Sequence, residues 1–135
     1  QPKAALAQLD RWLPVARKQL GDKHPQVQMG FDIRAQAADE LGDKALAMAS
    51  WRTLLEIREV ALGADDARTV DAAWQLEGML RSAGNRKEAD ALRARYIAPL
   101  LEAKEDSLSE EQAAKRKEII ETEREEARAA RTAAK

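Results

Sequence analysis

The sequence has few of the side chains that carry acid–base and metal chemistry. Its 135 residues include no Cys, one His and one Tyr, which excludes disulfides, thiolate zinc sites and Cys nucleophiles. His24 lies in a turn with only Asp22 nearby, too few ligands for a metal ion, and we expect it to cap a helix. No glycine-rich phosphate loop or Ser-His-Asp set is present. We therefore expect no metal, no cofactor and no enzyme activity.

The chain also lacks an excess of charge of one sign and any long apolar run. Its 23 Lys and Arg residues nearly balance 24 Asp and Glu residues, for a formal net charge of -1, so no overall field attracts nucleic acid or an anionic membrane. No apolar run approaches the roughly 20 residues of a membrane span, and QPKAALAQLD does not resemble a signal peptide. We expect a protein without nucleic-acid or membrane partners, cytoplasmic by default. Because it begins with Gln, we expect a segment of a longer protein.

Residues that favour β-strands are scarce. Val, Ile and Thr together number 13, against 28 Ala and 15 Leu, a composition typical of helices. Apolar residues recur at three- and four-residue steps, which predicts amphipathic helices. Pro14 and Pro99 fall inside this pattern, and we expect bends there, or a break at Leu13. The predicted helices span residues 3–20, 25–41, 44–62, 67–83, 86–104 and 108–132.

The turns between these helices repeat at an interval of 42 residues. Gly21 corresponds to Gly63 after a helix, and Gly42 corresponds to Gly84 at the alternate turn. Glycine at such positions supplies the positive φ that ends many helices. Asp66, like His24, is placed as an N-cap, and Asn85 with Glu88 forms a capping-box pattern. A fixed period of this length is typical of helical repeat proteins.

The segment LEIREVALGADDARTVDAAWQLEGMLRSAGNRKEADALRARY resembles the 42-residue variety of tetratricopeptide repeat found in kinesin light chains and in many bacterial proteins. The resemblance covers residues 5 to about 101 and includes Ala47 and Ala89, the DKHPQV loop and both glycine turns. It implies a right-handed α-solenoid of antiparallel helix pairs, with about two full repeats and flanking helices. The predicted domains are a repeat domain, 1–106, and a charged C-terminal helix, 107–135.

The resemblance also implies a binding surface, because the first helices of successive repeats line a concave groove that takes peptides or partner helices. Four of the implied groove residues are acidic, which favours a basic or amphipathic protein segment as partner. The groove residues implied by the resemblance are Met29, Asp32, Gln36, Asp39, Glu40, Asp71, Trp74, Gly78, Arg81 and Ser82.

Three charged residues depart from the family pattern. Arg34 and Arg93 stand where the family has large apolar residues, and Glu77 stands where it has a small one. Since an isolated buried charge is costly, we hypothesise that Arg34 or Arg93 pairs with Glu77. The alternative is a rotated helix that leaves all three side chains in water.

The three tryptophans have different expected roles. Trp12 and Trp51 lie on apolar stripes and are expected to pack between helices. Trp74 is expected either in the groove, as a contact of the kind enriched among interface hot spots, or in the core. Both interpretations of Trp74 remain open at this point.

The last stretch, SLSEEQAAKRKEIIETEREEARAARTAAK, has few large apolar residues. Ser107 and Glu110 form a capping-box pattern that places its helix start. We expect its first half to cap the repeats, with Ile119 or Ile120 docked on the last of them, and the remainder to project into water.

Three functions are compatible with this sequence. The first is a peptide-binding scaffold module within a larger, bacterial, regulatory or signalling protein. The second is self-association through the terminal helix or the open ends of the repeats. The third is a regulatory appendage of an enzyme whose catalytic domain lies outside the chain.

Overall fold

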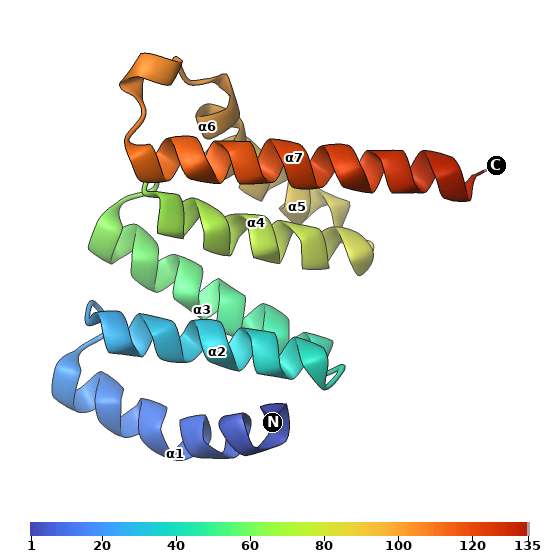
Figure 1. Ribbon diagram of the computed structural model, residues 1–135. Helices are drawn as coiled ribbons and strands as arrows, with labels where there is room; N and C mark the ends of the chain where they lie inside the picture. The colour runs from blue at the N-terminus through green and yellow to red at the C-terminus, as the bar shows by residue number, and fades with distance from the viewer. Residues whose placement is uncertain (135) are drawn as a thin grey trace.

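A computed structural model describes residues 1–134, which form only helices and turns (Figure 1). The all-α prediction is therefore confirmed for this part of the chain. Residues 86–102 form one run in which a π-helical turn, η1, separates two short α-helices. The elements are α1 (Pro2–Leu20), α2 (Pro25–Glu40), α3 (Lys44–Leu62), α4 (Ala67–Ser82), α5 (Arg86–Leu92), η1 (Arg93–Ile97), α6 (Ala98–Glu102), the 3₁₀ turn η2 (Glu105–Ser107) and α7 (Glu110–Ala133).

The helix ends follow the capping chemistry that the sequence predicts. The imidazole Nδ1 of His24 accepts a hydrogen bond from the Gln26 N–H at 3.1 Å, and Asp66 accepts one from the Arg68 N–H at 2.9 Å. These two caps are 42 residues apart and have nearly the same backbone, with φ/ψ of -69/132° and -64/138°. The predicted caps are therefore correct. The glycines after the helices all have positive φ: 84° at Gly21, 81° at Gly42, 93° at Gly63 and 85° at Gly84.

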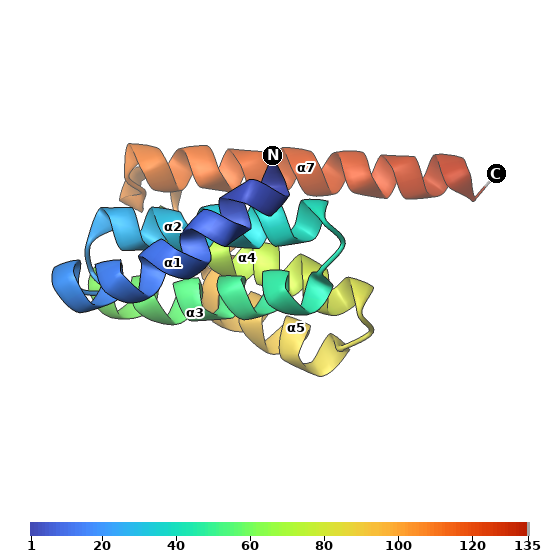
Figure 2. The same cartoon turned by 90° about the horizontal axis from the view of Figure 1, so that it is seen from below.

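Consecutive helices pack antiparallel in a layered stack (Figure 1). Seen from below, α7 runs along the side of the stack on which α2 lies, and α5 lies on the opposite side (Figure 2). A single apolar core extends from Leu9 and Leu13 of α1 to Ile119 of α7. Leu54 and Leu76, at its centre, are almost fully buried. Burial of these side chains is the main favourable free energy of the fold.

Of the three tryptophans, Trp51 lies in this core and Trp12 lies at its edge. Trp51 is 5% exposed, as predicted for a packing residue. Trp12 remains 39% exposed. It also lies against α2, because a Cβ added at Gly30 would be 3.0 Å from its Cζ3 atom.

The two predicted helices that contain an internal proline have different outcomes, and only the second has different bounds. Helix α1 runs through Pro14 without a break at Leu13. The predicted helix 86–104 instead changes to a π-helical turn and ends at Glu102. Its Pro99, which cannot donate a backbone hydrogen bond, lies in the first turn of α6, where that donor is not needed.

The last helix begins two residues later than predicted. The Ser107 hydroxyl donates to the Lys104 carbonyl oxygen at 2.6 Å, within η2, and so it does not cap α7. Ser109 takes that role in a reciprocal box, with its Oγ accepting from the Gln112 N–H at 3.1 Å.

Helix α7 docks through one large apolar side chain and then leaves the stack. Of the two isoleucines, Ile119 is fully buried and Ile120 is 39% exposed. From residue 124 to residue 134 every residue is exposed, and this part of α7 extends beyond the other helices (Figure 1). Both docking through Ile119 and projection of the remainder are therefore confirmed. No helix within residues 1–134 is long and apolar enough to cross a membrane.

Two glycines allow a matched test of these backbone assignments, because a Cβ at either Gly42 or Gly78 would meet no atom within 4 Å. Gly78→Ala lies inside α4, and we expect it to raise the free energy of unfolding by about 0.5–1 kcal/mol. Gly42→Ala, at φ 81°, should lower it by about 1 kcal/mol, since left-handed backbone is strained in alanine. Urea unfolding followed by circular dichroism measures both, and effects of the same sign would contradict the assignment.

Candidate functional site

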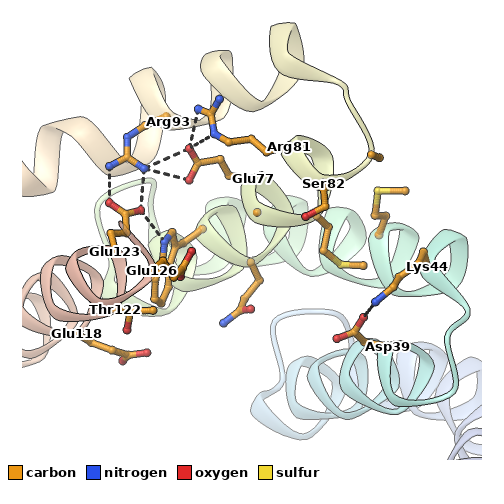
Figure 3. Close-up of a pocket in the computed structure, with 16 residues that line it drawn as sticks. Asp39, Lys44, Glu77, Arg81, Ser82, Arg93, Glu118, Thr122, Glu123 and Glu126 are labelled. Atoms are coloured by element: carbon orange, nitrogen blue, oxygen red, sulfur yellow. Dashed lines mark hydrogen bonds and ion pairs between the residues drawn. The ribbon is translucent and has the colours of Figure 1, made fainter. Parts of the chain in front are cut away.

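A cleft of about 690 Å³ opens between α4, α7 and the turn that joins α2 to α3 (Figure 3). Helix α4 forms its floor, because Trp74 and Gly78 are four residues apart and share one face. Helix α7 supplies one wall with side chains spaced by four residues, at positions 118, 122 and 126. The lining residues are Asp39, Lys44, Met48, Trp74, Gln75, Glu77, Gly78, Met79, Arg81, Ser82, Ala83, Arg93, Glu118, Thr122, Glu123 and Glu126.

The cleft contains half of the residues that the resemblance places in a groove. The five that line it are Asp39, Trp74, Gly78, Arg81 and Ser82. The five that lie outside it are Met29, Asp32, Gln36, Glu40 and Asp71. Most of the α2 contribution is therefore separate from the cleft, and the α4 contribution lies mainly within it.

Two of the outlying aspartates already have partners within the chain. Asp32 accepts a hydrogen bond from Gln36 and lies 3.6 Å from the buried guanidinium of Arg58. Burial lowers the pKa of Arg58, although Asp32 partly offsets this effect. Asp71 lies beneath α7 and accepts a hydrogen bond from the Lys115 ammonium at 2.8 Å. Each carboxylate is therefore engaged within the chain, with a side chain that is 25% exposed for Asp32 and 20% exposed for Asp71.

The wall formed by α7 was not among the candidate residues from the sequence. Glu118, Thr122, Glu123 and Glu126 belong to a helix expected only to cap and project. Their sequence signal is the four-residue spacing of Glu118, Thr122 and Glu126, which places them on one face of a helix. That spacing does not by itself indicate which neighbour the face meets, and only the docked position of α7 brings it to the cleft.

Trp74 links the cleft to α7 and to the core. Its indole Nε1 donates to Glu123 at 3.1 Å, and the Lys115 ammonium lies 5.8 Å from the ring centroid. The ring also packs against the apolar core while remaining partly exposed. Both expectations for Trp74, groove and core, therefore describe part of its position.

Glu77 is the centre of a charge network beneath the cleft (Figure 3). Its side chain is 4% exposed and lies 2.9 Å from Arg81 and 3.2 Å from Arg93. Arg93 also donates two hydrogen bonds to Glu123, at 2.9 and 2.7 Å. The hypothesis that Glu77 pairs with Arg93 is confirmed, whereas Arg34 pairs with Asp10 at 3.4 Å.

These contacts shift the proton affinities of the network. The hydrogen bonds that Arg93 makes to Glu123, and also those to Glu77, raise the pKa of the Arg93 guanidinium despite its partial burial. The same contact with Arg93 lowers the pKa of the Glu123 carboxyl, with help from the Trp74 N–H. These shifts favour the charged forms of Arg93 and Glu123, and paired charges of this kind avoid the penalty of isolated buried ones.

Further polar contacts fasten the part of α7 that precedes Ile119. Burial disfavours the charged form of Lys115, but hydrogen bonds to Asp71 and Glu118 outweigh burial and raise its pKa. The Arg116 guanidinium donates to the Ala103 carbonyl oxygen at 2.6 Å. Gln112 donates to the Asp65 carbonyl oxygen at 2.8 Å. The position of α7, and thus the shape of the cleft, depends on these directional contacts.

The cleft is lined by more acidic than basic side chains. Five carboxylates and three basic side chains line it, and so its local charge is negative although the whole chain is nearly neutral. Within residues 1–134 no cluster of His, Asp and Glu side chains is arranged to hold a metal ion. A partly exposed indole beside carboxylates suits an apolar group with a neighbouring cation.

Comparisons with known proteins give no further identification: no family model, no curated protein and no solved structure matches the chain.

The contact between Arg93 and Glu123 makes the stability depend on pH. Because the pKa of Glu123 is below its usual 4.5 in the folded chain, its contribution is complete above that pH and is lost as the pH falls through the folded-state value. We expect Glu123→Gln to lower the free energy of unfolding by about 1 kcal/mol at pH 7. The difference from wild type should shrink in acid.

Urea unfolding at a series of pH values measures this difference. Glu121→Gln is the matched control, because Glu121 is an exposed acid on the same helix. A difference for Glu123→Gln that stays constant from neutral to acidic pH would contradict the assigned role of Glu123.

Proposed function

We propose that the chain is a repeat domain of the 42-residue tetratricopeptide variety, folded as a right-handed α-solenoid. The support is the recurrence of the same turn geometry at that interval. The caps Asp43 and Asn85 have φ/ψ of -83/79° and -90/73°, and the residues that end α2 and α4, Leu41 and Ala83, agree within 2° in both angles. Equal turns that join antiparallel helices stack successive pairs in the same way.

In this proposal the domain is an interaction module of a larger regulatory or signalling protein, and it has no catalytic role of its own. The observation that carries the proposal is the cleft, where Trp74 forms part of the floor and carboxylates outnumber basic groups. Clefts of this volume fall in the range that binds ligands and peptide side chains. The matching partner is a basic or amphipathic segment of another protein.

The acidic side chains of the cleft differ in their exposure and in whether basic residues of the chain already bind them. Glu77 and Glu123 are engaged by arginines, and Asp39 is paired with Lys44. Glu118 accepts a hydrogen bond from Lys115 but is still 53% exposed, and Glu126 is exposed on the projecting part of α7. The proposed contacts are therefore an apolar side chain on Trp74 and Lys or Arg residues on Glu118 and Glu126.

Peptides selected from a random phage-displayed library provide a direct test. We expect them to be enriched in Lys and Arg beside an apolar or aromatic residue. Glu126→Lys should weaken the binding of a selected peptide by roughly fivefold, because it reverses a partly exposed charge at the edge of the cleft. Fluorescence anisotropy of the labelled peptide measures the dissociation constant.

The matched control is Glu125→Lys, which makes the same change one residue earlier on α7, outside the cleft lining. We expect it to leave the affinity nearly unchanged. Equal losses for the two variants would show a general charge effect instead of binding in the cleft. Selected peptides without basic residues would contradict the proposed partner chemistry.

A further inference from the structure

Gly78 lies in the interior of α4, on the floor of the cleft. Glycine in the interior of a helix is less favourable than alanine, because it loses more conformational freedom on folding. Its presence at this position therefore lowers the stability of α4. The fold gives a reason for each of the other five glycines of the chain, but not for Gly78.

Backbone conformation or packing accounts for those five glycines. The four that follow α1, α2, α3 and α4 have positive φ, which other residues rarely adopt. Gly30 lies against α1, and a Cβ at this position would be 2.8 Å from Cδ2 of Leu13, closer than van der Waals contact allows. Gly78 has a helical backbone, and a Cβ there would meet no atom within 4 Å. Neither the backbone nor any neighbour among residues 1–134 therefore requires glycine at position 78.

The space that a side chain at position 78 would occupy opens into the cleft. On the same face of α4, Trp74 lies one turn before Gly78, and Ser82, which has a small side chain, lies one turn after it. The indole of Trp74 donates a hydrogen bond to Glu123, and so it presents an oriented aromatic surface beside this space. We refer to the space bordered by Trp74, Gly78 and Ser82 as the Gly78 subsite.

The side chains that line the cleft with Gly78 favour an aromatic occupant. Met48 of α3 and Met79 of α4 both line it, and both pack on the apolar core while remaining partly exposed. Methionine side chains are flexible and make favourable contacts with aromatic rings, and an aromatic ring can also stack on the indole of Trp74. Because carboxylates outnumber basic groups in the cleft, charge complementarity favours an aromatic residue that has Lys or Arg beside it.

We propose that Gly78 is the specificity-determining residue of the cleft. Because position 78 has no side chain, the Gly78 subsite has room for one aromatic side chain of a basic partner segment, which approaches the α4 backbone between Trp74 and Ser82. This inference rests on the proposed function and adds to it the size and the chemistry of the anchoring residue. It also gives the glycine a role, since any side chain at position 78 would fill the space that the partner needs.

Short peptides of defined sequence test the proposal on the whole chain. The probes are acetyl-Lys-X-Lys-amide peptides with Trp, Leu or Ala at X, titrated to millimolar concentration while amide and indole N–H signals are followed in ¹H–¹⁵N NMR spectra. We expect the affinity to fall in the order Trp, Leu, Ala, by about tenfold in total, because the aromatic side chain fills the subsite best. The signals of the Gly78 amide and the Trp74 indole should shift on binding.

Two substitutions at position 78 should weaken binding according to their size. We expect Gly78→Ala to weaken the binding of the Trp peptide by roughly threefold and Gly78→Leu by about tenfold, because each new side chain takes up part of the subsite. Since Gly78→Ala is expected to stabilise the fold, a loss of affinity in that variant does not come from unfolding. Ala129→Leu is the matched control: it adds a leucine at an exposed position of α7 outside the cleft lining and should leave the affinity unchanged.

A double-mutant cycle between protein and peptide separates direct contact from an indirect effect. The Ala peptide leaves the subsite empty, and so Gly78→Leu should change its affinity by less than about twofold. If Gly78→Leu weakens all three peptides equally, or if the three bind the wild type equally well, the inference is overturned while peptide binding in the cleft stands. If no peptide shifts the signals of Glu118, Thr122 or Glu126, the cleft does not bind basic peptides, and the proposed function is overturned together with this inference.

Discussion

The buried carboxylate of Glu77 is the constraint on which the C-terminal half of the structure depends. A charge at 4% exposure is tolerable only when cations and hydrogen bonds replace its lost water. Arg81 comes from the same helix, and Arg93 comes from the start of the π-helical turn. Because Arg93 then binds Glu123, satisfying one buried charge also fixes where α7 lies. These contacts therefore determine the position of the cleft wall that α7 forms.

The same network explains how a helix with so little apolar surface can dock. Only Ile119 of α7 is fully buried, and burying one such side chain contributes about 2 kcal/mol. Contacts through Lys115, Arg116 and Glu123 add directional bonds to this burial. They join α7 to Asp71 of α4, to the Ala103 carbonyl oxygen just after α6, and to Arg93 of η1. The polar contacts thereby determine the position and orientation of α7, and burial of Ile119 contributes the apolar part of its binding to the stack.

The sequence was sufficient for elements whose signals are local. Glycine at position 63 and the Asp66 cap lie next to the helix ends that they define. For Glu77 the sequence left two possible partners, Arg34 and Arg93, because both also depart from the repeat pattern that the chain resembles. Local signals failed at the start of α7. Ser107 and Ser109 are each followed three residues later by a side chain that could complete a capping box, Glu110 or Gln112. The outcome depended on the Lys104 carbonyl oxygen, which accepts a hydrogen bond from the Ser107 hydroxyl. The role of Glu118 and Glu126 required the docked position of α7, which no nearby residue encodes.

The placement of the three tryptophans determines the intrinsic fluorescence of the molecule. Trp51 lies in the dry core, Trp12 borders water, and Trp74 lies between a carboxylate and an ammonium group. An indole emits at wavelengths set by the polarity and fields around it. The intrinsic fluorescence is therefore a sum of three environments: on the first helix, in the core on α3, and between α4 and α7. Replacing any two of these indoles by phenylalanine would leave a reporter of a single region.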